Sequence, residues 1–258
     1  MPPINYLVNG EYGTGYEPDL YDYRDRIFST IASPAALPSH VDPLDTAFPI
    51  YDQKQTNACV GFSYKAAAQI VLKSRVELSA GFIWYLGRKA LGWETRNAGC
   101  RIRDAIKAGN IYGCASEAQY ETSQARLATP PTGDAIAQAG DHPLLAYAAI
   151  EASLDVKAAV AAGDPVILGT VLTESFEAAK GNGGFFPVPR GGMTGAHAMV
   201  VVGYDDSIYF PDWNVYGGLR LRNSWTTRWG DKGYGWMPYK HFDTPAVQDC
   251  WMLSSIKE

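Results

Sequence analysis

The chain has 258 residues, a length that allows either one compact two-lobed unit or two small domains. Its 47% apolar and 19% charged residues supply enough material for a hydrophobic core and exclude wholesale disorder. The formal net charge is −5, and the 22 lysine and arginine residues are scattered along the chain, which argues against binding to a nucleic-acid backbone.

The sequence carries no signal for a membrane. Its apolar runs stay below the roughly 18 residues that a membrane-spanning helix needs. Its start, MPPINYLVNGEYG, lacks the basic stretch and the apolar stretch of an export signal. We therefore expect a soluble protein that binds neither membrane nor nucleic acid, and that is cytoplasmic or secreted by a signal-independent route.

The first 36 residues differ from the rest of the chain. Proline, glycine, tyrosine and aspartate dominate them, as in GYEPDLYDYRD, and no helical apolar period begins before Ile27. This composition predicts an extended N-terminal segment, residues 1–36, that lies on a body starting near Leu37.

A helical pattern begins after Thr56. Apolar side chains recur at helical spacing over residues 59–75, and Thr56 or Asn57 stands where an N-cap is expected. We therefore predict a helix from Cys59 to Arg75.

Two more helices are predicted before residue 130. Ser79 opens the helix GFIWYLGRKAL, which Gly92 closes, and the helix IRDAIKA is expected to end at Gly109. Residues 37–130 are therefore predicted to be mainly helical.

Beyond the PPTG turn at residues 130–133, short strand-like runs replace the helical pattern, so residues 131–258 are predicted to be mainly β. GLRLRN alternates apolar and polar residues, as a half-buried antiparallel strand does, and residues 155–162 form a brief helix. The strand-like runs are PVILGTVL (165–172), GAHAMVVVGY (195–204), GLRLRN (218–223) and DCWMLSSI (249–256). A helical part followed by a strand-rich part predicts an α+β fold with two lobes and a cleft between them.

The cysteines are spaced too widely for a metal-binding or dithiol motif. None of Cys59, Cys100, Cys114 and Cys250 forms a C-x-x-C pair, so spacing gives no support to a zinc site. Cys100 and Cys114 flank a short helix and are the more plausible pair for a disulfide, although spacing alone does not establish that their Cα atoms come close enough.

Three residues in separate segments suit nucleophilic chemistry. Cys59 stands at the first turn of a predicted helix, where the positive end of the helix dipole favours a thiolate. His197 begins a strand of small and β-branched residues, which would hold its ring rigidly at a cleft. Asn223 ends a strand in RNSWTTRWGDKGYGW, where its amide oxygen could orient an imidazole.

These segments together resemble the papain-like cysteine peptidases. QKQTNACVGFS (53–63) looks like the nucleophile segment of that family, GAHAMVVVGY its histidine strand, and RNSWTTRWGDKGYGW its asparagine segment. The separation of Cys59 and His197 falls in the range of roughly 130 to 150 residues typical of papain-type enzymes, and Asn223 lies slightly beyond it. The resemblance covers about residues 37–258, and GYEPDLYDYRD resembles a leader of short bacterial members.

The resemblance implies a two-lobed papain-like fold and a role for each matched residue. Cys59 would be the nucleophile, His197 the general base and acid, and Asn223 the residue that orients the imidazole. Trp225 would shield that contact from water. Gln53, six residues before Cys59, would donate to the oxyanion beside the backbone amide of Cys59. A peptide or protein substrate is implied, and no metal or organic cofactor.

The sequence also departs from the family pattern. Lys54 follows Gln53 where glycine is usual, which leaves the oxyanion loop in question. The glycine pair of the family's substrate groove is missing, and GCRIRD (99–104) stands near its place. Ala196, Cys100 and Arg101 are our candidates for substrate binding. For Arg101 and Arg103, a solvated helix start is the simpler explanation.

Three questions stay open at this stage. We expect the N-terminal segment to pack along the body, with an inhibitory position across the cleft as the alternative. A Cys/His amidase or transpeptidase acting on cell-wall or isopeptide bonds is the nearest rival activity, because the same thiolate chemistry serves any acyl transfer. A catalytically silent papain-like binding protein is the rival from another class.

Overall fold

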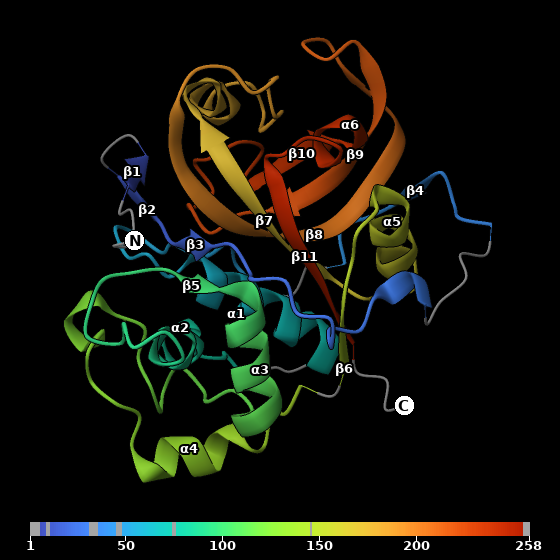
Figure 1. The fold of residues 1–258 in the computed structure, drawn as a ribbon. Helices are drawn as coiled ribbons and strands as arrows, with labels where there is room; N and C mark the ends of the chain where they lie inside the picture. The colour runs from blue at the N-terminus through green and yellow to red at the C-terminus, as the bar shows by residue number, and fades with distance from the viewer. Residues whose placement is uncertain are drawn as a thin grey trace.

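The computed structural model describes residues 6–8, 11–30, 36–44, 48–73, 76–144 and 146–254. The helices are α1 (Cys59–Leu72), α2 (Ala80–Lys89), α3 (Ile102–Tyr112), α4 (Gly133–Ala139), α5 (Ser153–Ala161) and α6 (Tyr239–Phe242). The strands are β1 (Tyr6–Val8), β2 (Tyr12–Thr14), β3 (Tyr16–Glu17), β4 (His40–Val41), β5 (Cys100–Arg101), β6 (Ala146–Ala149), β7 (Val166–Thr173), β8 (Met193–Phe210), β9 (Val215–Arg222), β10 (Tyr234–Pro238) and β11 (Val247–Ser254). The helical half and the sheet half lie one above the other in Figure 1, which confirms the predicted α+β class.

The sheet is a curved antiparallel array. Its strand order is β10-β9-β8-β7-β11-β6, and β4 also pairs with β8, at Tyr204 and Asp205. Every pairing within it is antiparallel. The strand β8 spans residues 193–210 and pairs with both β7 and β9, so it forms the backbone of this half. The end of β8 and the start of β9 form a hairpin, in which Tyr209 pairs with Tyr216 and Phe210 with Val215.

The helix α1 lies between the sheet and the helices α2 and α3. It contacts α2 and α3 on one side and β7, β8 and β11 on the other, and most of its side chains are buried all round. A helix that is apolar on every face belongs in a protein interior. Two polar residues are buried there with a partner each: Lys65 pairs with Glu77 at 2.8 Å, and the Oε1 atom of Gln69 accepts the Tyr51 hydroxyl at 2.7 Å.

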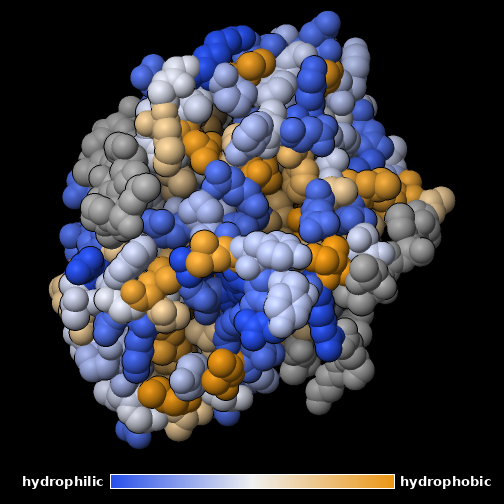
Figure 2. Space-filling model, viewed as in Figure 1, coloured by the Kyte–Doolittle hydropathy of each residue, from blue (hydrophilic) through white to orange (hydrophobic). Residues whose placement is uncertain are grey.

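Two apolar clusters form the core, one on each face of the sheet. One joins α1, α2 and α3 to one face of the sheet and contains Cys59. The other fills the opposite face of the sheet beneath α5 and contains Trp225. Figure 2 shows hydrophobic and hydrophilic residues intermingled over the visible face rather than gathered into one broad patch. None of the described helices is long and apolar enough to span a membrane.

The predicted start of α1 is confirmed, but the prediction that Thr56 or Asn57 caps it is wrong. Ala58 occupies the N-cap position without a side-chain hydrogen bond. The Thr56 hydroxyl donates instead to the Gln53 carbonyl at 2.6 Å, and the Asn57 side chain donates to the Asn97 carbonyl at 2.7 Å. Tertiary partners have therefore replaced the local cap. The helix ends at Leu72, short of the predicted end at Arg75, because Lys73 adopts the left-handed conformation with a φ of 48°. Arg75 itself lies outside the described residues.

Of the two later helices, α2 matches its prediction and α3 runs longer than expected. Ser79 caps α2 by accepting from the amide of Phe82 at 3.0 Å. The helix α3 passes Gly109 and ends at Gly113, whose φ of 78° suits glycine. A Cβ on Gly109 would lie 1.8 Å from the Tyr64 hydroxyl oxygen. Gly109 therefore serves close packing and does not end the helix.

The strand-rich part holds two further differences. The helix α4, which the sequence analysis did not predict, lies with α2 and α3 in Figure 1. The strand β9 is antiparallel as predicted, but it is buried along most of its length rather than half-buried, because it lies between β8 and β10. Its arginines stay buried by donating to acceptors, as Arg222 does to the carbonyl of Pro49 at 2.5 Å.

The proposed pairing of Cys100 with Cys114 is wrong. All four cysteines are free and buried. The Cys100 side chain lies against Gly87 of α2, whereas the Cys114 thiol points at the carbonyls of Ser79 and Ala115 at 3.6 Å. The two thiols therefore pack into different neighbours rather than facing each other.

Candidate active site

His197 and Asn223 meet at the inner end of the strands β8 and β9. The Nε2 atom of His197 lies 2.8 Å from the Oδ1 atom of Asn223, and both side chains are buried. Asn223 follows directly after β9, and its Oδ1 also accepts the amide of Ser224 at 2.7 Å. Because an amide oxygen only accepts, Nε2 of the neutral imidazole carries the proton and Nδ1 is left as the basic nitrogen.

The Trp225 ring covers this contact. It stacks on the His197 ring with centroids 4.4 Å apart and planes inclined by 27°, and it is itself buried. Phe176 and Trp229 pack against its edges. The aromatic cover excludes water from the His197–Asn223 hydrogen bond, which strengthens that bond.

Cys59 is the first residue of α1 and lies against the strand that carries His197. Burial raises the pKa of the Cys59 thiol to about 11, opposed by hydrogen bonds from the backbone amides of Ala198 and Gly15. Burial likewise lowers the pKa of His197 to about 4, opposed by the bond to Asn223. The Nδ1 atom of His197 has no hydrogen-bond partner within the described part of the chain. At neutral pH both groups are therefore uncharged in this arrangement.

Gln53 is fixed by contacts on both ends of its amide. Its Oε1 accepts the Ser224 hydroxyl at 2.5 Å, and its backbone amide donates to the Ser224 carbonyl at 3.0 Å. Its Nε2 donates to the Thr56 carbonyl at 3.0 Å and to the Gly13 carbonyl at 2.9 Å. The donor end of Gln53 is thus aimed at an oxygen of the N-terminal segment.

Lys54 adopts the conformation that glycine would favour. Its φ is 51°, in the left-handed region. Its carbonyl accepts the amide of Gly13 at 3.1 Å. The loop after Gln53 therefore turns as a glycine would allow, with a lysine bearing the backbone strain.

The N-terminal segment crosses over Cys59, which is the alternative to the expected packing along the body. The strands β2 and β3 enter between the helical half and the sheet in Figure 1. The ring of Tyr12 stacks on Trp225 with centroids 5.2 Å apart. A Cβ on Gly15 would lie 1.9 Å from the Asn57 carbonyl oxygen, and a Cβ on Gly13 would lie 2.3 Å from that of Thr56. Two glycines let the backbone approach the site closely.

The next part of the segment does pack along the body. Arg103 of α3 is buried beneath it, and its guanidinium donates to Asp25 at 2.8 Å and to the carbonyl of Leu20. Asp22 and Asp19 lie 3.6 and 4.0 Å from the same guanidinium. The interpretation of Arg103 as part of a solvated helix start is therefore wrong, because it holds the aspartates of GYEPDLYDYRD.

Comparisons with known proteins agree with this geometry. A family model described as "Papain family cysteine protease" matches residues 37–252. This chain belongs to that family. The structure is similar to that of xylellain, a cysteine protease from Xylella fastidiosa, with a TM-score of 0.83 and 27% identity over 95% of this chain and 96% of the other. These findings confirm the resemblance to the papain family, bacterial members included, and the papain-like fold.

Two more members extend the comparison. An uncharacterized peptidase C1-like protein of Acanthamoeba polyphaga mimivirus is 27% identical over 190 residues, 69% of this chain. The chain spans 58% of the length of that relative. Bromelain from Ananas comosus, at 20% identity, has the same fold, with a TM-score of 0.64 over 84% of this chain and 99% of the other.

The three residues expected to bind substrate lie at or beside the N-terminal segment of this papain-family chain. The backbone amide of Cys100 donates to the Gly15 carbonyl at 3.0 Å. Arg101 pairs with Glu17 in the short parallel ladder of β3 and β5. Ala196 stands next to His197 in β8, opposite Val171. Their binding of a substrate stays a prediction.

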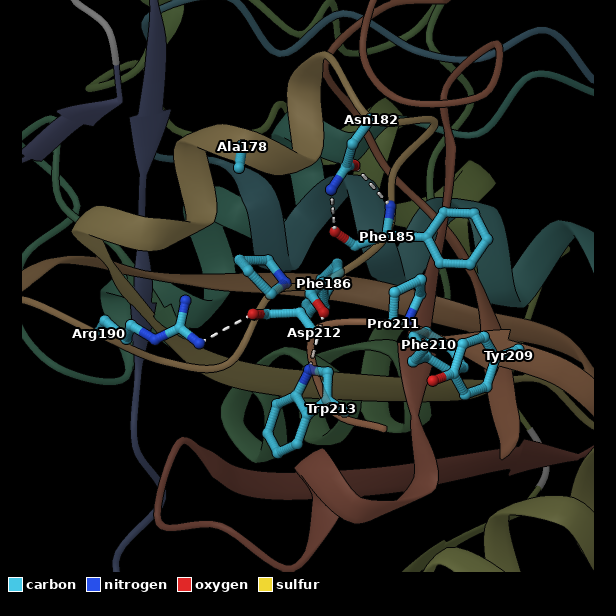
Figure 3. A pocket seen from close by; sticks show the side chains of 11 residues that line it. Ala178, Asn182, Phe185, Phe186, Arg190, Tyr209, Phe210, Pro211, Asp212 and Trp213 are labelled. Carbon is cyan, nitrogen blue, oxygen red and sulfur yellow. Dashed lines mark hydrogen bonds and ion pairs between the residues drawn. The ribbon is translucent and has the colours of Figure 1, made fainter. Parts of the chain in front are cut away.

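One cavity lies away from these residues. Its volume is about 530 Å³, and Figure 3 shows that aromatic side chains line it, with Asn182 folded back onto Phe185 and Arg190 paired with Asp212 at 2.8 Å. Neither Cys59 nor His197 lines it. The sequence analysis gave no sign of it, because its walls come from two separate stretches, residues 178–190 and the end of β8 with the turn after it.

Sequence reasoning missed three contributors to the site, which are Ser224, the stretch 12–16 and Asp249, whose carboxylate accepts from the Tyr16 hydroxyl and the Asp19 amide. It named Arg103 but gave it the wrong role. Ser224 fixes the Gln53 amide, and its place in the Asn-Ser-Trp motif was a usable signal. The acidic run in GYEPDLYDYRD, set against a buried arginine, was another. Within the described residues, no group of three histidine, cysteine or acidic side chains is arranged to hold a metal ion.

Proposed function

We propose that this papain-family protease cleaves peptide bonds through a thioester on Cys59. The observation that carries the proposal is the set formed by Cys59 at a helix N-terminus, His197 with a free Nδ1, and Asn223 bonded to Nε2. Trp225 shields the set. It has the parts that an activated thiol requires: a nucleophile, a base and a group that orients the base.

The reaction runs in two halves. His197 Nδ1 takes the Cys59 proton, and the thiolate attacks the peptide carbonyl carbon to give an oxyanion, which accepts from Gln53 Nε2 and the Cys59 amide. The C–N bond then breaks, and the amine leaves with the proton held by His197. Water attacks the thioester, His197 takes its proton, and the acid leaves as the thiolate is regenerated.

The arrangement described here is the latent form of that site. Gly13 places a carbonyl oxygen where Gln53 would bind the oxyanion, and Gly15 covers the thiol. Burial by the segment holds both the thiol and the imidazole uncharged. When the segment leaves, water reaches both groups, the pKa of Cys59 falls, that of His197 rises, and the ion pair becomes accessible.

The test uses the full chain in four forms: wild type, Cys59→Ala, Cys114→Ala and Gly15→Ala. Each is treated with an epoxysuccinyl peptide, read by intact mass, and with a mixture of fluorogenic peptides. We expect one adduct and peptide hydrolysis that vanish in Cys59→Ala, persist in Cys114→Ala and rise in Gly15→Ala. Hydrolysis that persists in Cys59→Ala contradicts the proposal, as does the absence of adduct and hydrolysis in Gly15→Ala. Labelling without hydrolysis of any peptide favours the binding protein.

A further inference from the structure

The cavity of Figure 3 is separated from the catalytic residues by a row of aromatic rings. Phe186 forms part of its wall, and the ring of Phe176 packs edge-on against Phe186 with centroids 4.9 Å apart. Phe176 packs in turn against Trp225 at 6.1 Å, and Trp225 covers His197. The cavity is therefore a separate space, and the proposed reaction does not use it.

Aromatic rings from two stretches of the chain form the walls. They are Phe185, Phe186, Tyr209, Phe210 and Trp213. Phe185 and Phe210 meet edge to face with centroids 5.4 Å apart. The Nε1 atom of Trp213 donates to the Phe186 carbonyl at 2.9 Å. These contacts join one stretch to the other and fix the walls relative to each other.

Further hydrogen bonds hold the loop that carries Phe185 and Phe186. The Asn182 side chain accepts the amide of Phe185 and donates to its carbonyl, each at 2.9 Å. The amide of Phe186 donates to the Trp236 carbonyl of β10 at 2.9 Å. Gly184 has a φ of 83°, and a Cβ there would lie 2.5 Å from a backbone oxygen of β10. An apolar hollow with such fixed walls is typical of a site for a small molecule.

The polar side chains that line the cavity have their partners within the protein. Arg190 donates to the Asp212 carboxylate at 2.8 Å, and Asp212 also accepts the amide of Val188 at 2.6 Å. The Tyr209 hydroxyl donates to the Asn214 side chain at 2.9 Å. Arginine and aspartate cancel each other's charge, so the walls offer rings and no net charge.

A neutral histidine lies behind these walls. His241 is only 4% exposed, and its ring stands edge-on to Phe186 at 5.7 Å and to Trp213 at 5.6 Å. Neither of its ring nitrogens has a hydrogen-bond partner within the described part of the chain. Burial lowers the pKa of His241 to about 4. At neutral pH this ring therefore adds no charge to the surroundings of the cavity.

We infer that the cavity binds a flat, uncharged aromatic molecule of two or three rings, and that it disfavours the same ring system when it bears an anionic group. Its volume of about 530 Å³ lies in the range of about 300–1,000 Å³ typical of small-molecule sites. A flat ring can stack on the wall rings or meet them edge to face. An anion would enter an apolar space whose one lining cation, Arg190, is already paired with Asp212. The inference goes beyond the peptidase function and does not depend on it.

A first experiment compares two fluorescent probes on the full chain. N-phenyl-1-naphthylamine and 8-anilino-1-naphthalenesulfonate carry the same rings, and only the second bears a sulfonate. Both emit more strongly in apolar surroundings, so each Kd follows from a titration. We expect saturable binding of the uncharged probe and a Kd about tenfold higher for the sulfonate. A Kd for the sulfonate equal to or below that of the uncharged probe overturns the inference, as does the lack of saturable binding of the uncharged probe.

A second experiment places the probe in the cavity. Ala178 lines the cavity and is exposed, so Ala178→Phe adds a ring there without disturbing the core. We expect it to raise the Kd of N-phenyl-1-naphthylamine about tenfold or more. Ala161→Phe adds the same ring at an exposed alanine of α5 outside the cavity and should bind as wild type. Equal binding by Ala178→Phe and wild type means that the probe sits elsewhere and overturns the inference.

A wall variant covers the case in which Ala178→Phe does not fold. Tyr209→Ala removes a lining ring that is 41% exposed. We expect it to raise the Kd of the uncharged probe severalfold. Tyr112→Ala removes a tyrosine of α3 that is 43% exposed and does not line the cavity, so it should bind as wild type. Equal binding by Tyr209→Ala and Tyr112→Ala overturns the inference.

A third experiment tests the reason for the charge selection. Asp212→Asn keeps an acceptor for the Val188 amide and frees the charge of Arg190. We expect the Kd of the sulfonate probe to fall severalfold while that of the uncharged probe stays the same. Asp141→Asn, at an exposed position after α4, changes the net charge equally and should alter neither Kd. An unchanged Kd for the sulfonate in Asp212→Asn overturns the role of this ion pair. Cys59→Ala should bind both probes as wild type, so the outcome is independent of peptide hydrolysis.

Discussion

The side-chain amide of Gln53 donates to the backbone carbonyl of Gly13 at 2.9 Å, across 40 positions of sequence. The same Nε2 atom is the donor that we propose for the oxyanion. One atom thus serves two states that exclude each other, the covered site and the reacting site. A change at Gln53 should therefore act on both in opposite directions.

In Gln53→Ala, Cys59 should be labelled faster than in wild type, and peptides should be hydrolysed more slowly. Loss of the bond to Gly13 loosens the segment, so iodoacetamide reaches Cys59 sooner. Loss of an oxyanion donor costs about 10²–10³ in kcat. The two rates are measured on the same preparation, with Gln55→Ala, two residues further along the same loop, as the control. Turnover equal to that of wild type would contradict the oxyanion role, whatever the labelling rate.

Gly15→Ala should expose Cys59 without unfolding the body. The added Cβ would lie 1.9 Å from the Asn57 carbonyl oxygen, a backbone atom that cannot move aside cheaply. We expect labelling of Cys59 at least tenfold faster, with a far-ultraviolet circular dichroism spectrum that matches wild type. Gly133→Ala is the matched control, because a Cβ there meets nothing within 4 Å. Labelling at the wild-type rate in Gly15→Ala would show that the segment does not guard the thiol.

The segment should hold more weakly as pH rises from about 4 to about 7. Burial, together with the charge of Asp249, raises the pKa of Asp19 to about 7, opposed by the Trp251 hydrogen bond and by Arg103. In the released segment this carboxyl returns to an ordinary value near 4. The docked form therefore binds a proton that the released form has lost. The extra stability that Asp19 gives the docked segment over the released one is therefore fully present below about pH 4 and lost above about pH 7.

Asp19→Asn isolates that effect. Asparagine keeps an acceptor for Trp251 and Arg103 but cannot ionise. We expect the ratio of Cys59 labelling rates, wild type to Asp19→Asn, to rise between pH 4 and pH 7. Taking the ratio cancels the titration of the thiol itself and of the other acidic residues. A ratio that stays constant over this range would rule out Asp19 as the source of the pH dependence.

The site was predictable where chemistry restricts the residue type. A thiol at a helix start, a histidine in a strand of small and β-branched residues, and an asparagine after a strand stand in local motifs, and the structure joins His197 to Asn223. The strand β8 begins at Met193, so the prediction that His197 opens it is wrong. The position of Gln53 followed from its offset to Cys59 alone. Such residues can be found from sequence because few residue types have the chemistry that these positions require.

The path of the N-terminal segment was not predictable in the same way. Its position depends on glycines that approach a loop 40 residues away and on Asp25 meeting a buried arginine of α3. Neither contact leaves a local pattern, since aspartate and glycine are equally typical of a solvated loop. The missing cap of α1 has the same cause, because Thr56 and Asn57 bond to residues that only the folded chain brings near.

Gly109 offers the sharpest test of such a contact, because the sequence suggests a helix end and the structure shows a packing site. Alanine is the better helix former by roughly 0.5–1 kcal/mol, so a surface position would gain stability. Here the Cβ would lie 1.8 Å from the hydroxyl oxygen and 2.3 Å from Cζ of the buried Tyr64. Overpacking of this kind costs about 1–3 kcal/mol. We therefore expect Gly109→Ala to lower the free energy of unfolding in urea, whereas Gly133→Ala, in the open first turn of α4, should leave it unchanged or raise it. A gain of stability in Gly109→Ala would mean that α3 and α1 are not packed as closely as described.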